Sequence, residues 1–241
     1  MKQLIDYARK YETADFLNGD PSWFMHQVSG NDNQEAMALI ASALSYGSRK
    51  QFMPKIQLLL NASGGEPYNW VLDGGYKSLF SPDDERCFYR LYSNSKMYQF
   101  LQAYQQLLTE HTTLGDYVRH HANDGFSAVE AICCYFSSKG VSAIIPKDTT
   151  SACKRVCMFL RWMVRNQSPV DLGLWADFID RRTLIIPLDT HVATQSRRLG
   201  LISSPTASMS TARKLTAKLA EIFPEDPLKG DFALFGYGVN N

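Results

Sequence analysis

Residues 184–200 read LIIPLDTHVATQSRRLG and join a short apolar run to a segment with the signals of a helix. The apolar run ends at Pro187, Asp189 is a favoured helix N-cap, and Gly200 is a favoured stop. The pattern therefore predicts a helix over about 189–199. It leaves two interpretations of Asp189 open, because the carboxylate serves either as a cap alone or also as a reactive group. His191 falls in the first turn, where a lone histidine is usually a surface residue.

Helical periodicity dominates the rest of the chain. Apolar residues recur at helical spacing from Asn33 to about Tyr46, Gly47 supplies a stop, and a further helix continues through Leu60 with a kink near Pro54. Further helices are expected at about 95–109, 126–137, 150–166 and 210–223, a loop at 61–76, and strand-like composition only at 142–145 and 184–186. The sequence therefore predicts one all-α domain over 1–241, with helices packed as two lobes around a cleft.

Composition narrows the function classes. Of 241 residues, 45% are hydrophobic and 20% charged, which is ordinary for a soluble globular protein. The apolar runs are too short to cross a bilayer and the N-terminus has no signal-peptide core, so we expect a cytoplasmic protein without membrane contact. Five cysteines, an odd number with two adjacent, favour reduced thiols. Cys153 and Cys157 lie four apart, but no second pair of ligands has zinc-site spacing, so no metal site is expected.

Residues 151–165 read SACKRVCMFLRWMVR and form a second informative helix. At about 100° per residue one face is apolar, whereas Lys154, Met158, Arg161 and Arg165 share the opposite face. From Lys147 to Arg165 the chain has five basic residues and one acid, although its overall net charge is only +1. The pattern fits an amphipathic helix with a solvated charged face, and it also fits a positive stripe for a phosphate backbone. The helix N-terminus suits a phosphate or solvent equally.

The aspartate segment resembles that of the endonuclease III-type enzymes, which belong to the helix-hairpin-helix (HhH-GPD) superfamily of DNA glycosylases. Residues 186–192, IPLDTHV, are similar to their Val-Asp-Thr-His-like core, and residues 197–200, RRLG, to the end of the helix that follows. The resemblance puts Asp189 at the family's catalytic aspartate and Lys154 at its catalytic lysine. Patches at 33–51 and 231–238 resemble the family's early and closing helices.

The resemblance implies a two-lobed HhH-GPD-like fold, with the hairpin and catalytic helix at about 140–166 and the aspartate segment at about 184–200. It implies a base-excision glycosylase, with or without AP-lyase activity, that acts on a flipped-out base, an oxidised purine being favoured. Lys154 would attack C1′ and Asp189 would stabilise the cationic sugar. DNA contacts are expected from Lys147, Thr149, Thr150, Ser151, Arg161, Tyr46, Arg49, Lys50 and His191, and a base pocket from Trp162, Trp175 and Phe235. Ordinary packing is the alternative for Tyr46 and for the three pocket aromatics.

The hairpin and the spacing differ from endonuclease III. Residues 145–150 read IPKDTT where that enzyme has Gly-Val-Gly, and Asp189 follows Lys154 by 35 residues, a longer spacing. Both features are similar to the archaeal 8-oxoguanine glycosylases. No four-cysteine run is present, so no iron–sulfur cluster is expected, and the resemblance allows a monovalent cation at the hairpin. The sequence as a whole is most similar to a bacterial family catalogued as a domain of unknown function.

Two other functions stay open at the level of sequence. One is a non-catalytic or RNA-directed nucleic-acid-binding protein on the same fold, and the other is a helical interaction protein with no nucleic-acid role. Kinase, dehydrogenase, serine hydrolase and zinc protease activities lack support, because none of their glycine-rich, nucleophile-elbow or His-Glu-x-x-His motifs is present. The expected partner is double-stranded DNA with a damaged base, and the protein is expected to be a monomer.

Overall fold

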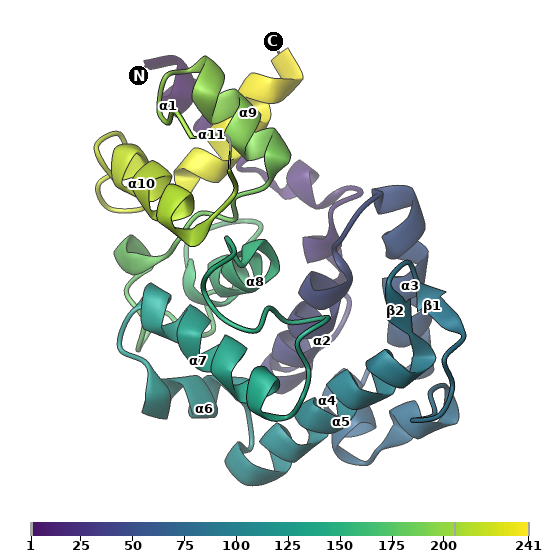
Figure 1. Cartoon of the computed structure of the whole chain (residues 1–241). Helices are drawn as coiled ribbons and strands as arrows, with labels where there is room; N and C mark the ends of the chain where they lie inside the picture. The colour runs from purple at the N-terminus through teal and green to yellow at the C-terminus, as the bar shows by residue number, and fades with distance from the viewer. Residues whose placement is uncertain (1, 205, 241) are drawn as a thin grey trace. The chain divides into compact units, whose positions relative to one another are not determined.

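The computed structural model describes residues 2–204 and 206–240, and it is mostly helical (Figure 1). Its α-helices are α1 Lys2–Tyr11, α2 Asn31–Leu44, α3 Arg49–Ala62, α4 Pro67–Leu72, α5 Asn94–His111, α6 Leu114–His121, α7 Gly125–Ser138, α8 Lys154–Val164, α9 Thr190–Arg198, α10 Met209–Ala220 and α11 Lys229–Asn240. The short 3-10 helices are η1 Ala14–Leu17, η2 Pro21–His26, η3 Gly75–Ser78 and η4 Arg181–Thr183. Strands β1 Cys87–Tyr89 and β2 Tyr92–Ser93 pair in one antiparallel hairpin. The predicted helical class is therefore confirmed.

Several predicted boundaries are wrong. Helix α8 begins at Lys154 rather than near residue 150, because Cys153 has a φ of 46° and the chain cannot be helical there. The expected loop at 61–76 contains α4, which starts at Pro67, a residue suited to the first turn of a helix. Segments 142–145 and 184–186 form no strand, and the hairpin lies at 87–93 instead.

The chain divides into two compact units. Unit 1 comprises residues 1–18, 122–130 and 148–241, and unit 2 comprises residues 19–121 and 131–147. Both candidate catalytic residues, Lys154 and Asp189, belong to unit 1. No helix in the described part of the chain is long and apolar enough to cross a membrane.

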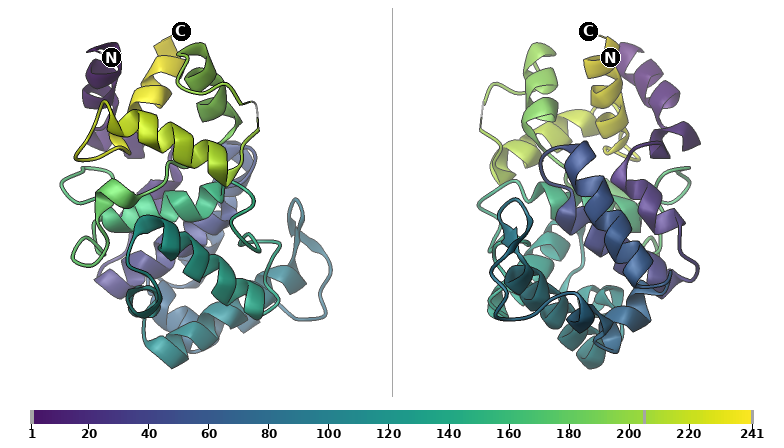
Figure 2. Two further views of the ribbon diagram at one scale, coloured as in Figure 1. Left: turned by 60° about the vertical axis from the view of Figure 1, so that its left-hand side comes forward. Right: turned by 90° about the vertical axis from the view of Figure 1, so that its right-hand side faces the viewer.

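In unit 1, α11 lies beside α1 and α9, and Figure 2 shows α11 in yellow next to α1 in purple. Edge-to-face ring contacts join the two helices, from Tyr7 to Tyr237 and from Tyr11 to Phe235. Gly236 makes this approach possible, because a Cβ atom there would overlap the Tyr11 ring. The missing side chain thus determines how closely α11 packs on α1.

Replacing Gly236 with alanine is expected to destabilise the protein by about 1–3 kcal/mol, because the extra methyl group overpacks the α1–α11 contact. Thermal unfolding followed by circular dichroism measures the effect. Adding Tyr11→Leu, which removes the obstructing ring, should recover part of the loss. If the thermal unfolding midpoint of Gly236→Ala is unchanged, α1 and α11 can move apart without a loss of stability, and the prediction is contradicted.

In unit 2, α2 is buried on nearly all sides and contacts η2, α3 and α4. Its single buried acid, Glu35, accepts the backbone N–H groups of Leu114 at 2.8 Å and Gly115 at 3.1 Å. These groups belong to the first turn of α6, where backbone donors lack helical partners and the dipole favours an anion. A buried charge is thus satisfied by capping a neighbouring helix.

Candidate active site

Lys154 is the first residue of α8, and its side chain is 37% exposed. Arg155 follows it, and no acid lies in the first turn. Two cations at the positive end of a helix dipole oppose helix stability. A sequence that places cations where helices favour acids is typical of a functional site.

Asp189 is the N-cap of α9, as its place after Pro187 predicted. Its Oδ1 accepts the backbone N–H of Val192 at 2.8 Å, and the backbone at Asp189 is extended. At the other end, Gly200 has a φ of 69° and follows the last helical turn, so the predicted stop is also confirmed. Local sequence signals therefore position the carboxylate.

The two side chains meet. Lys154 Nζ lies 3.1 Å from Asp189 Oδ2, while Oδ1 caps α9, so the carboxylate uses one oxygen for each task. Burial opposes ionisation of Asp189, but the Lys154 ammonium, the Val192 N–H and His191 together lower the pKa of this carboxyl. The Asp189 side chain is 33% exposed, so the pair is accessible to a ligand.

The lowered pKa of Asp189 predicts a pH-dependent contribution to stability. The contribution of ionised Asp189 to the free energy of unfolding is fully present above the unfolded carboxyl pKa of about 3.9. This contribution is lost as the pH falls through the lower pKa of the folded state. Asp189→Asn keeps a good N-cap but removes the charge. For a partly exposed pair worth under about 1 kcal/mol, the variant should melt at most about 4 °C lower at pH 6. The gap should narrow as the pH falls below about 4 and through the lower folded pKa, and a gap of constant size would contradict the assignment.

A second carboxylate, Asp231, lies in the first turn of α11 and interacts electrostatically with both Lys154 and Asp189. Burial raises the pKa of Asp231, and so does the negative charge of Asp189, whereas Arg161 and Lys154 oppose the shift. Arg161 forms an ion pair with Asp231 through Nη1. Sequence analysis placed Asp231 only in the closing helix and missed its electrostatic link to the site.

A family model described as "Protein of unknown function (DUF2400)" matches residues 20–240, which is most of the chain. The chain belongs to the DUF2400 family. No curated protein and no solved structure matches it. The Lys154–Asp189 pair of this family member lies inside the matched range.

The predicted positive stripe is wrong at Arg161 and Arg165. Both side chains are almost fully buried in this DUF2400 protein, so they form neither a solvated face nor a phosphate-binding one. Arg161 pairs with Asp171 and Asp231, and Arg165 pairs with Asp171, Asp226 and Glu12. Burial raises the pKa of Asp171 despite the two guanidinium groups. The prediction that Arg161 contacts DNA is therefore wrong, because its charge is used inside unit 1.

The predicted base-pocket aromatics are mostly core residues. Trp162 is fully buried, and its indole N–H has no hydrogen-bond partner within the described residues. Trp175 is 2% exposed and packs edge-to-face on Phe159. Phe235 is half-buried and packs on Tyr11 and Phe16. Packing thus accounts for Trp162 and Trp175, and neither lines an open pocket.

Four predicted DNA-contact residues of unit 1 are accessible to differing degrees. Ser151, Thr150 and His191 are exposed and Thr149 is half-buried. The Thr150 hydroxyl already donates to Asp148 at 2.5 Å. His191 packs against Gly238, where a Cβ atom would overlap the imidazole ring. Ser151 and His191 lie close in sequence to Lys154 and Asp189, respectively.

The other predicted contacts belong to unit 2. Lys147 and Lys50 are exposed, and Arg49 is exposed but paired with Asp20 at 3.1 Å. Tyr46 is 38% exposed. No described group of three His, Cys, Asp or Glu side chains is arranged to hold a metal ion.

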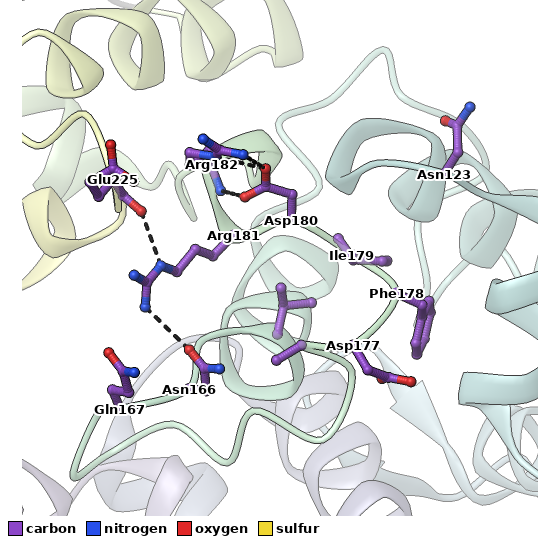
Figure 3. A pocket seen from close by; sticks show the side chains of 12 residues that line it. Asn123, Asn166, Gln167, Asp177, Phe178, Ile179, Asp180, Arg181, Arg182 and Glu225 are labelled. Atoms are coloured by element: carbon purple, nitrogen blue, oxygen red, sulfur yellow. Dashed lines mark hydrogen bonds and ion pairs between the residues drawn. The ribbon is translucent and has the colours of Figure 1, made fainter.

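Unit 1 also has an open polar cavity of about 630 Å³, shown in Figure 3. Arg181 crosses it, donating to the Glu225 carbonyl at 3.0 Å and to Asn166 Oδ1 at 3.2 Å. Neither Lys154 nor Asp189 lines it. Val164, on its wall, is the last residue of α8, roughly 15 Å along the helix axis from Lys154. The cavity is therefore separate from the candidate active site.

Proposed function

We propose that this protein is a DNA base-excision glycosylase with AP-lyase activity, with the helix-hairpin-helix glycosylase fold, acting as a monomer on duplex DNA. The observation that carries the proposal is the 3.1 Å contact between Lys154 Nζ and Asp189 Oδ2, between the N-termini of two helices and open to solvent. An amine beside a carboxylate suits attack on a sugar carbon followed by stabilisation of positive charge. The resemblance of residues 186–200 to the glycosylase aspartate segment points to the same chemistry.

The reaction uses both side chains. Attack requires the neutral amine, and Asp189 is the carboxylate placed to take the lysine proton. Lys154 Nζ then forms a bond to C1′ of the flipped nucleotide, and the bond from C1′ to the base breaks. The electron pair leaves with the base, which gains a proton. Once it has given the lysine proton to the departing base, Asp189 is ionised again, the state that its lowered pKa favours, and its charge stabilises the positive sugar.

Strand cleavage follows from the covalent intermediate. When the C1′–O4′ bond breaks, O4′ takes up a proton and Lys154 is left in a Schiff base with the opened sugar. Loss of a proton from C2′ then expels the 3′ phosphate by β-elimination. An oxidised purine is the proposed lesion, on the resemblance to the archaeal 8-oxoguanine glycosylases alone. The nucleotide would be extruded from the stack before C1′ is attacked.

Phosphate binding is assigned to the surface around the pair. The first turn of α8 has backbone N–H groups without helical partners, in addition to the charges of Lys154 and Arg155. Exposed Ser151 precedes this turn, and exposed His191 lies in the first turn of α9. These groups would orient the sugar–phosphate backbone, whereas the base would be recognised separately.

Borohydride trapping tests the proposal. The full chain is incubated with duplexes that each contain one modified base, and sodium borohydride reduces any Schiff base to a stable amine. The expected result is a covalent protein–DNA adduct whose modified peptide contains Lys154. Duplex binding without an adduct on any lesion would overturn the proposal and favour a non-catalytic nucleic-acid-binding protein.

A further inference from the structure

The open cavity of unit 1 contains an arginine that has no acidic partner. Arg181, the first residue of η4, donates from Nε to the Glu225 carbonyl at 3.0 Å and from Nη1 to Asn166 Oδ1 at 3.2 Å (Figure 3). Both acceptors are neutral, and no carboxylate in the described part of the chain forms an ion pair with this guanidinium. Its Nη2 makes no hydrogen bond to a described residue. One edge of the guanidinium can therefore bind a ligand.

The Glu225 side chain lines the same cavity and has no cationic partner. It is exposed, and among residues 2–204 and 206–240 no lysine, arginine or histidine forms an ion pair with its carboxylate. Arg181 binds the backbone carbonyl of this residue instead of the carboxylate. A cation and an anion thus lie on neighbouring parts of one wall without pairing with each other. This arrangement complements a ligand that carries both charges.

The neighbouring charges of the wall pair with each other. Arg182 binds Asp180 through Nε at 2.7 Å and through Nη2 at 2.6 Å. These bonds lower the pKa of Asp180, and the charge of Arg181 is the smallest contribution to that shift. Asp180 in turn raises the pKa of Arg182, and Glu225 contributes least. With Asp177 the wall has two arginines and three acids, a net charge of −1, so it favours a ligand of positive net charge.

The backbone of the wall fixes the position of Arg181. Gly173 packs directly on Asn166, because a Cβ atom at Gly173 would lie only 2.7 Å from the Asn166 Cα. Gln167, the next residue of the wall, has a φ of 61°, a costly conformation that is typical of ligand sites. The cavity volume of about 630 Å³ is in the range of small-molecule sites. Apolar contacts are available from Val164, Ala176 and Ile179.

We propose that this cavity binds a free basic α-amino acid, with its carboxylate on Arg181 and its α-ammonium group on Glu225. The carboxylate would accept hydrogen bonds from Nη1 and Nη2, the paired geometry that guanidinium groups favour. The basic side chain would match the negative net charge of the wall, while its methylene groups pack on the apolar residues. The site goes beyond the proposed glycosylase activity, because neither residue of the catalytic pair lines the cavity.

Isothermal titration of the full chain with L-arginine, without DNA, tests this site. L-Argininamide lacks the carboxylate and N-acetyl-L-arginine lacks the ammonium group, so each should bind at least about tenfold more weakly. Arg181→Gln and Glu225→Gln should each cause a loss of the same size. Glu225→Gln keeps the backbone carbonyl that holds Arg181, so it leaves the wall intact. Arg197→Gln is the matched control, because Arg197 is exposed on α9 of the same unit and does not line the cavity.

Several results would overturn the amino-acid site. Equal binding of N-acetyl-L-arginine would identify a peptide C-terminus instead, and a loss with Arg181→Gln but not with Glu225→Gln would identify a site for anions alone. Binding of deoxyadenosine monophosphate without binding of L-arginine, or no L-arginine binding at millimolar concentration, also contradicts it. Circular dichroism verifies that each variant is folded.

The titration and borohydride trapping report on different sites. An adduct without L-arginine binding removes only the amino-acid site. L-Arginine binding without an adduct on any lesion supports the amino-acid site and removes only the glycosylase proposal.

Discussion

Lys154→Gln is expected to abolish the borohydride-trapped adduct and to lower base release by at least about a thousandfold, the scale of loss when a nucleophile is removed. Glutamine has no amine to attack C1′, yet it fits the partly exposed position beside Asp189. Duplex binding should persist, because the substitution removes only one of the groups that are proposed to bind phosphate. Single-turnover release of the base and gel analysis of the adduct measure the effect.

Lys214→Gln is the control for this experiment. Lys214 is exposed on α10 of the same unit, so its substitution removes an equal charge from a helix that contains neither residue of the pair. It should trap as well as the unaltered protein. If the two variants trap equally, Lys154 is not the nucleophile. If Lys154→Gln no longer binds duplex, the lysine acts in binding and the chemical assignment has to be revised.

Arg165→Met should lower the free energy of unfolding by about 3–5 kcal/mol, because it leaves the buried Asp171 and Asp226 and the half-buried Glu12 without their shared cation. The guanidinium is 1% exposed and contacts Asp226 at 2.9 and 2.7 Å, as well as Asp171 and Glu12. Since domains are stable by only about 5–15 kcal/mol, the loss is a large fraction of the whole. Urea unfolding followed by circular dichroism measures it.

A surface ion pair provides the comparison. Lys218 and Glu221 lie 2.8 Å apart with both side chains more than half exposed, so Lys218→Met should cost under about 1 kcal/mol. The same result for both variants would mean that the buried acids are protonated or rehydrated when Arg165 is absent. Because Arg165 is the C-cap of α8, folded Arg165→Met protein should also show weaker trapping by Lys154 than the Lys218 variant.

For the charged face of α8, the sequence predicted which residues share the face but not which of them are buried. Helical spacing placed Lys154, Arg161 and Arg165 on one face, and in the structure α8 contains Lys154 and Arg161 and ends with Arg165 as its C-cap. Lys154 is accessible, whereas the arginines are buried by acids 6 to 153 residues away along the chain. Spacing along one helix contains no information about which distant segments cover it. The same limit applies to Asp231 and to the burial of Trp162 and Trp175.

The hairpin was missed for a different reason. Turn signals such as Asn-Gly are absent from residues 89–92, and the strands contain only three and two residues. Contacts with Tyr46 and Lys96 impose the left-handed Arg90 conformation that the local sequence disfavours. Tertiary support therefore overrode local propensity at this turn.

The amino-acid sequence alone determined the helical class, the cap at Asp189 and the stop at Gly200, because these depend on groups within a few residues of one another. Tertiary structure alone decided that Lys154 touches Asp189, that Arg161 and Arg165 are internal, and that the β1–β2 turn has a left-handed conformation at Arg90. These outcomes depend on which helices pack together. Burial then determines whether a given charge is hydrated, paired or free to react.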